Sequence, residues 1–177
     1  MEKIRPSETK QFKPLIQELE SQGKKVYKFD HGDVNIALPL DIVSQMPRYF
    51  EKAGWYKYGS SQGDSDIVSY LADKYSVTTE EIVISAGAKQ ALFTLALMLF
   101  NESDDVVVVA PYWSTYKSQI EVVGANCRVF ESESPQINPE KLREYIETLQ
   151  KPRAILINNP NNPSGYTYSR EELREVL

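Results

Sequence analysis

A segment near the carboxyl end of the chain has the composition of a ligand-holding loop. Residues 158–168, NNPNNPSGYTY, place four asparagines, two prolines and a glycine within their first eight positions. No helix or strand continues through such a run, and a generic turn does not need so many turn-forming residues. Asn-Pro peptide bonds can be cis, which fixes the shape of a loop. An asparagine amide held there is able to donate a hydrogen bond to an oxygen atom of a bound ring.

Two further loops suit a phosphate and a planar ring. In residues 85–92, SAGAKQAL, small side chains let the backbone approach a ligand, and free N–H groups at the start of the following helix attract an anion. In residues 110–116, APYWSTY, Tyr112 and Trp113 offer aromatic faces on which a ring stacks. Each loop also has a simpler interpretation: small residues serve close packing, aromatic residues cap cores, and Lys89 suits a solvent-exposed surface.

The order of elements predicts how these loops meet. We expect strands over residues 81–85, 105–109, 127–130 and 154–157, alternating with helices over residues 64–75, 89–100, 115–123 and 139–149. Alternating strands and helices predict an α/β domain with a mostly parallel sheet. Because ligands bind at the carboxyl ends of such strands, the three loops are expected to open on that one edge.

Individual elements carry more specific expectations. The four valines in residues 105–109 are typical of a strand covered on both faces. The helix at 89–100 is apolar nearly all round, which predicts its burial. We also expect an early amphipathic helix stopped by Gly23, a helix at 41–53 kinked or shortened by Pro47, and a final helix with Ser169 as N-cap and Glu172 at the capping-box position.

Composition excludes several classes of protein. The net charge is −5, without blocks of basic residues, which argues against nucleic-acid partners. His31 is the one histidine and Cys127 the one cysteine, so a zinc site cannot be assembled and no metal site is expected. No apolar run approaches the roughly 20 residues that span a bilayer, so we expect no membrane partner. The lone cysteine suits a reducing compartment, and we expect a cytoplasmic protein.

The joint order of four motifs resembles a known family. NPNNPSG, ISAGAKQAL, APYWSTY and WYKYG stand in the order found in the class I/II aminotransferases, the aspartate aminotransferase superfamily of fold-type-I pyridoxal-phosphate enzymes. The resemblance runs from about Phe29 to the end. It implies a three-layer α-β-α large domain with a mostly parallel sheet, truncated here. Residues 1–40 then correspond to an N-terminal arm and the start of a small domain, and residues 41–177 to the first part of the cofactor-binding domain.

The resemblance also implies how this chain holds the cofactor pyridoxal 5′-phosphate. The backbone of Gly87, Ala88 and Lys89 should bind the phosphate. Trp113 should stack on the pyridine ring. Asn162 should donate a hydrogen bond to the 3′-oxygen of the ring.

Two further residues imply a partner subunit and a substrate. Tyr58 matches a tyrosine that reaches the phosphate of the neighbouring subunit, which implies a homodimer. Gly32 matches the glycine whose backbone meets the substrate carboxylate, although Gly32-Asp33-Val34-Asn35 replaces the common Gly-x-Pro-Asp. GDSDIV, at residues 63–68, likewise replaces the more usual glycine followed by Leu-Arg, and both departures leave the substrate open. His31 either lines the substrate pocket or is a packed or solvent-facing side chain.

The lysine that carries the chemistry in this family is expected elsewhere. The Schiff-base lysine, the acidic partner of the pyridine nitrogen and the carboxylate-binding arginine lie downstream of the NPxNPxG segment in the family, and no lysine of this chain stands in a matching position. We therefore expect the chain to be the front part of a longer aminotransferase, with no catalytic residue of its own and no transaminase activity alone. The whole enzyme would move an amino group between an amino acid and a 2-oxo acid.

Two other functions fit the same motifs. One is a different fold-type-I enzyme, such as a carbon–sulfur lyase, a decarboxylase or an aminocyclopropane-carboxylate synthase. The other is a non-catalytic binding or regulatory module on this fold, although no basic DNA-binding domain is visible in the sequence.

Overall fold

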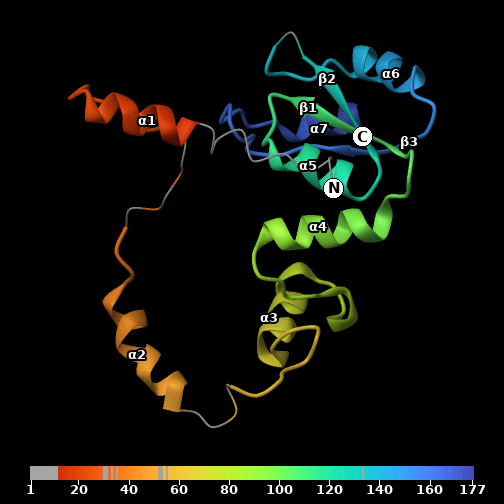
Figure 1. The fold of residues 1–177 in the computed structure, drawn as a ribbon. Helices are drawn as coiled ribbons and strands as arrows, with labels where there is room; N and C mark the ends of the chain where they lie inside the picture. Colours follow the sequence, from red (N-terminus) through yellow and green to blue (C-terminus); the bar gives the residue numbers. More distant parts are fainter. Residues whose placement is uncertain are drawn as a thin grey trace. The chain divides into compact units, whose positions relative to one another are not determined.

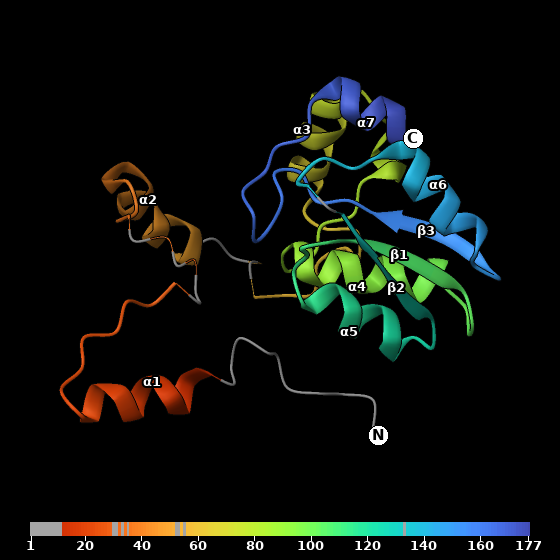
Figure 2. The same cartoon turned by 90° about the horizontal axis from the view of Figure 1, so that it is seen from above.

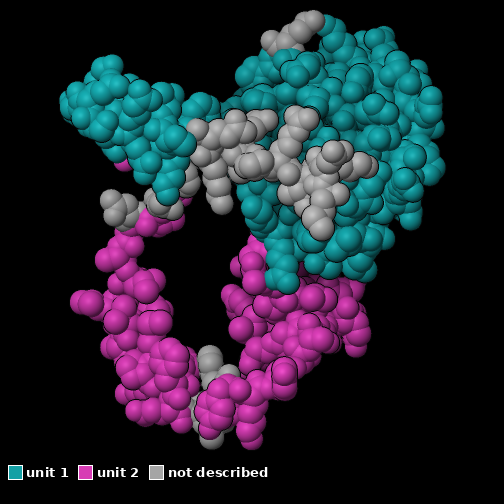
Figure 3. All heavy atoms as spheres, viewed as in Figure 1, with its two compact units in different colours: residues 1–26, 89–177 teal, residues 27–88 magenta. Residues whose placement is uncertain are grey.

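The computed structural model describes residues 12–177 except residues 30, 31, 33, 35, 52, 53, 55 and 133. The chain forms two compact units, coloured separately in Figure 3. The sheet unit comprises Lys89–Leu177 and the described residues up to Val26, and the loop-and-helix unit comprises Tyr27–Ala88. The predicted domain boundary between residues 40 and 41 stays a prediction.

The sheet unit is built around three parallel strands in the order β2-β1-β3 (Figure 1). β1 (Asp105–Ala110) lies between β2 (Asn126–Glu131) and β3 (Pro152–Leu156). Residues 106–109 are all buried, as expected for a strand covered on both faces. The predicted parallel sheet is therefore confirmed.

Helices cover both faces of this sheet (Figure 2). Their bounds are Ala88–Leu99 for α4, Thr115–Val122 for α5, Pro139–Glu147 for α6 and Arg170–Val176 for α7. On one face Val106 and Val108 pack with residues of α4 and α5, and on the other Val107 and Val109 pack with residues of α6 and α7. Because alternate residues of a strand point to opposite faces, one valine run supplies both cores. The three-layer α-β-α arrangement is as predicted.

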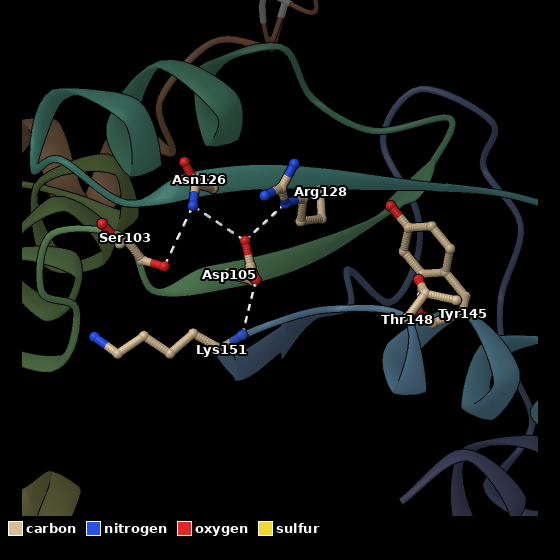
Figure 4. Close-up of polar contacts among 7 residues, drawn as sticks. All are labelled: Ser103, Asp105, Asn126, Arg128, Tyr145, Thr148 and Lys151. Atoms are coloured by element: carbon tan, nitrogen blue, oxygen red, sulfur yellow. Dashed lines mark hydrogen bonds and ion pairs between the residues drawn. The ribbon is translucent and has the colours of Figure 1, made fainter.

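A buried carboxylate joins the three strands at the amino end of the sheet (Figure 4). The Oδ1 atom of Asp105 accepts hydrogen bonds from Arg128 Nε at 2.7 Å and Asn126 Nδ2 at 3.1 Å, both on β2. Its Oδ2 atom accepts one from the backbone N–H of Lys151, next to β3, at 3.0 Å. Burial acts to raise the pKa of Asp105, but these donors outweigh burial and hold the pKa below its ordinary value. The ionised carboxylate thus fixes the strands at the edge opposite to the ligand loops.

The loop-and-helix unit contains α2 (Leu40–Glu51), α3 (Ser65–Tyr75) and the 3₁₀ turn η2 (Thr79–Glu81). α2 covers most of the helix predicted at residues 41–53 and contains Pro47, and the kink or shortening expected at Pro47 stays a prediction. The Asp64 side chain caps α3 by accepting from two backbone N–H groups of its first turn. The Gln62 side chain donates to the carbonyl oxygens of Thr79 and Ile82, the latter at 2.8 Å, so the loop before α3 is anchored on η2.

Helix ends agree well with the sequence. α1 (Phe12–Ser21) is followed by Gly23 at a φ of +72°, the left-handed conformation in which glycine ends a helix. Before α7, Ser169 and Glu172 form the predicted capping box. No helix among the described residues has the length and apolar character needed to cross a membrane.

The strand predicted at residues 81–85 does not form. Glu81 ends η2 instead, and the backbone is extended at Ile82. The Ile84 N–H donates to the Gln62 carbonyl oxygen at 2.8 Å. A strand needs a ladder of such bonds to a neighbouring strand. The consecutive β-branched residues 82–84 favour extended backbone, but they do not supply a neighbouring strand.

Helix α4 is also less buried than predicted. Ala96 is its buried residue, whereas the side chains of Leu97 and Met98 are 58% and 75% exposed. Leu92 and Phe100 pack toward the sheet. An apolar helix is buried all round only if neighbours surround it, and the described residues cover one side.

Candidate active site

Two of the three predicted loops meet at the carboxyl edge of the sheet. β1 ends at Ala110 and β3 at Leu156, and because these strands are parallel neighbours, their following loops leave from the same edge. The side-chain amide of Asn161 donates to the carbonyl oxygen of Pro111 at 3.0 Å and so joins the loops directly. The Ala110–Pro111, Asn159–Pro160 and Asn162–Pro163 peptide bonds are all cis. The predicted juxtaposition is therefore confirmed for these two loops.

The asparagine loop is held by its own side chains. The side-chain amide of Asn159 donates to the backbone oxygen of Tyr168 at 3.1 Å, and its oxygen accepts from the Tyr168 N–H at 2.9 Å. The side chain thus pairs with the Tyr168 backbone in the way that the backbone of a neighbouring strand does. Asn158 Oδ1 accepts from the backbone N–H of Asn162 at 2.9 Å. The Asn162 side chain is exposed and has no hydrogen-bond partner among the described residues. It is therefore available to a ligand on a backbone that is already fixed.

Trp113 lies in a defined aromatic and cationic environment. Its half-buried ring meets Tyr116 edge-on, with 5.4 Å between the ring centroids. The ammonium group of Lys89 lies 5.4 Å from the Trp113 ring centroid, within the range of a cation–π interaction. The backbone oxygen of Lys89 accepts from Gln119 Nε2 at 2.8 Å, which ties the start of α4 to α5. The Lys89 side chain is exposed, as predicted for a surface lysine, and its ammonium group lies beside the tryptophan that is predicted to bind the ring.

The predicted phosphate loop turns at Gly87, whose N–H donates to the Ser85 carbonyl oxygen at 2.8 Å. Gly87 has a φ of +86°, and a Cβ atom built on it would have no neighbour within 4 Å, so this backbone needs glycine and leaves room for a ligand. α4 begins at Ala88, where the first N–H groups of a helix lack helical partners. Gly87 and Ala88 belong to the loop-and-helix unit. Of the three predicted phosphate ligands, Lys89 is the one placed relative to Trp113.

The remaining predicted site residues lie in the loop-and-helix unit. Tyr58 and Gly32 are exposed, and their contacts with a partner's phosphate and a substrate carboxylate stay predictions. His31 and the Trp55 of WYKYG lie outside the described residues.

Two residues of this site were missed from the sequence. Asn161, next to the predicted Asn162, is the buried residue that joins the two loops. The asparagine pair itself was a usable signal, since an exposed loop does not need two adjacent asparagines unless they differ in role. Gln119 gave no such signal, because its contact with Lys89 depends on how α5 lies beside α4.

Comparison with protein families decides the relationship. The family described as aminotransferase class I and II matches residues 24–177. The chain belongs to this family.

Relatives of this aminotransferase-family chain are longer. An aspartate aminotransferase of Bacillus sp. strain YM-2 is 30% identical over 98% of the chain, which covers 46% of that relative. A probable aspartate/prephenate aminotransferase of Aquifex aeolicus is also 30% identical, and the chain covers 45% of it. The structure of aspartate aminotransferase from Thermotoga maritima matches 99% of the chain and 48% of its own length, with a TM-score of 0.82 and 29% identity. The chain thus spans about half the length of these relatives.

Class I and II aminotransferases are generally pyridoxal-phosphate enzymes, and the residues present fit such a group. The open backbone at Gly87 suits a phosphate. The half-buried Trp113 ring and the exposed amide of Asn162 stand on loops that the Asn161–Pro111 hydrogen bond joins. A flat ring with a polar oxygen matches this pair of side chains.

Proposed function

We propose that these residues form the cofactor-binding part of a pyridoxal-phosphate-dependent aminotransferase, which moves an amino group between an amino acid and a 2-oxo acid. The observation that carries this proposal is the Asn161–Pro111 hydrogen bond, because it joins the loops of Trp113 and Asn162 at the ligand edge of a parallel sheet. Family membership supports the reaction class.

The residues have separate tasks in this proposal. The backbone of Gly87, Ala88 and Lys89 holds the phosphate, through the N–H groups at the start of α4 and with the aid of the dipole of that helix. Trp113 holds the ring flat, and Asn162 donates a hydrogen bond to its 3′-oxygen. When bound, the cofactor supplies an electron sink for the carbon atom that carries the amino group.

Substrate, assembly and location are part of the same proposal. Relatives named aspartate aminotransferases, one of them a Thermus thermophilus enzyme solved with maleate, favour an acidic amino acid as donor. The exposed Tyr58 supports a homodimer in which each subunit contributes to its partner's phosphate site. We place the protein in the cytoplasm. Burial raises the pKa of the lone Cys127 thiol to about 11, so the thiol stays protonated there.

The proposed site is tested by binding of pyridoxamine 5′-phosphate, which resembles the cofactor but lacks the aldehyde that reacts with surface lysines. We expect saturable quenching of tryptophan fluorescence. Asn162→Ala should weaken binding about tenfold, as expected for loss of one well-placed hydrogen bond. Asn101→Ala, an exposed change at the other edge of the sheet, should not alter binding. Absence of saturable binding by the unaltered chain would reject the proposal.

Amino transfer is tested on the whole protein. The coding region that contains these 177 residues should encode a downstream Schiff-base lysine, and its product should transfer the amino group of aspartate to a 2-oxo acid. We expect no transfer by the 177-residue chain alone, because no lysine in it matches that position. Transfer by the purified chain would contradict this expectation.

A further inference from the structure

Two adjacent asparagines have opposite surroundings in the ligand loop. Asn161 is 7% exposed, whereas Asn162 is exposed. The buried amide of Asn161 donates to the Pro111 carbonyl oxygen, 50 positions earlier in the sequence, at 3.0 Å. One buried side chain therefore joins the two ligand loops.

The backbone of Asn161 closes the same loop. Its N–H donates to the Tyr166 carbonyl oxygen at 2.8 Å, and its carbonyl oxygen accepts from Gly165 at 2.8 Å. Its Oδ1 atom lies 3.4 Å from the Ser164 N–H, which donates to it. Both the backbone and the side chain of this residue are thus satisfied within the protein. Asn161 is not available to a ligand, and its contribution must be made through its neighbours.

These neighbours are the two residues proposed to hold the cofactor ring. Asn162 follows Asn161 directly, and Trp113 is two residues beyond Pro111. We infer that Asn161 is a positioning residue, which fixes the distance and angle between the Asn162 amide and the Trp113 ring before the cofactor binds. This inference rests on the proposed function. A ring held from its face and from one oxygen tolerates little movement between the two holding groups, so prior fixation favours binding.

The alternative is that Asn161 serves stability alone. Asn159 provides a matched control, because it is the same residue type in the same loop and makes two hydrogen bonds to Tyr168. Neither of those bonds reaches the 110–113 segment. A change at Asn159 therefore removes loop contacts without releasing Pro111.

The test compares Asn161→Ala with Asn159→Ala in the 177-residue chain. Two readouts are measured: affinity for pyridoxamine 5′-phosphate, and the induced circular dichroism of the bound ring, which reports its orientation. We expect Asn161→Ala to weaken binding at least about tenfold and to change the induced signal. Asn159→Ala should alter affinity by less than about threefold. Equal effects of the two changes would show a stability role and overturn the inference.

A double-mutant cycle shows whether Asn161 acts through Asn162. If it does, Asn161→Ala should weaken binding by a smaller factor in the Asn162→Ala background than in the unaltered chain. If Asn161→Ala weakens binding by the same factor in both backgrounds, the two residues act independently and the inference is overturned. If Asn161→Ala does not fold, Asn161→Asp keeps the size and the Oδ1 acceptor but loses the donor to Pro111, and the same outcomes apply. A chain that binds no pyridoxamine 5′-phosphate at all rejects the proposed function, whereas normal binding by the Asn161 variants rejects the inference alone.

Discussion

How far a single position in this chain tolerates substitution depends more on its immediate neighbours than on its residue type. Asp105 is an acidic residue with almost no exposure, which is acceptable because three donors from two flanking segments satisfy it. Gly63 is one of several glycines with positive φ, but at +121° it also lies against Ile84, so that a Cβ atom would come within 2.4 Å of Ile84 Cγ1. Both positions are predicted to tolerate little change.

Replacing the Asp105 carboxylate tests the first case. Asp105→Asn keeps the shape but turns an NH₂ group toward groups that are themselves donors. We expect a loss of about 1–3 kcal/mol in the free energy of unfolding, as for buried donors left without an acceptor. Urea unfolding followed by circular dichroism measures this loss. Glu144→Gln removes the same charge from an exposed position, and an equal loss there would mean that net charge, not the buried contacts, explains the effect.

Adding one methyl group tests the second case. Gly63→Ala must adopt a strained φ and displace the Ile84 side chain close to its own backbone. The backbone strain is expected to cost about 1–3 kcal/mol. Gly59→Ala, in the same unit and with open space around its Cβ position, should be nearly neutral. Urea unfolding of the two variants gives the comparison, and similar midpoints would contradict the predicted contact.

The positions of the helices in this chain are specified mainly by the capping residues at their ends. Ser169 caps α7 as the sequence predicts, and Asp64, predicted as the first residue of a helix, is the N-cap of α3. In α7 the cap is coupled to the ligand loop, because Glu172 accepts from the Ser169 N–H at 2.7 Å and from the Tyr166 hydroxyl at 2.6 Å. Tyr166 in turn accepts from the N–H of Asn161. The helix end and the ligand loop are therefore expected to stabilise each other.

This coupling predicts a pH dependence. The hydrogen bond from Tyr166, followed by that from the Ser169 backbone, lowers the pKa of Glu172. A carboxyl with a lowered folded-state pKa stabilises the fold above its unfolded-state pKa, and this contribution is lost as pH falls through the folded-state pKa. Relative to Glu172→Gln, the unaltered chain should therefore lose its advantage as pH falls from neutral through this range. Urea unfolding of both proteins at several pH values measures it, and a difference that does not change with pH would contradict the prediction.

The whole molecule leaves part of an apolar helix exposed. In α4, Ala96 is buried while its neighbour Leu97 is 58% exposed. The chain covers about half the length of its relatives, so the exposure of α4 is stated here for the described residues alone. Within the described structure, the two neighbours should respond differently to the same substitution.

A charge placed on α4 makes this difference measurable. Leu97→Glu should change the free energy of unfolding of the 177-residue chain by no more than about 0.5 kcal/mol, as for an exposed position. Ala96→Glu should cost about 2 kcal/mol or more, because it buries a carboxylate. Circular dichroism of urea unfolding tests both variants. A large loss in Leu97→Glu would show that this side of α4 is covered.

The sequence alone determined most of the elements, their order and the loops of the candidate site. Helix caps, the valine run and the alternation of strands and helices are local patterns, and local patterns record which backbone shape and which buried face a segment prefers. The asparagine loop could be located because no regular element passes through it. What the tertiary structure decided is which segments become neighbours. Residues 81–85 lack a strand ladder, α4 is covered on one side, and Asn161 rather than Asn162 is buried against Pro111. Such pairings depend on contacts between segments far apart in the chain, and the pattern of one segment does not record its partner.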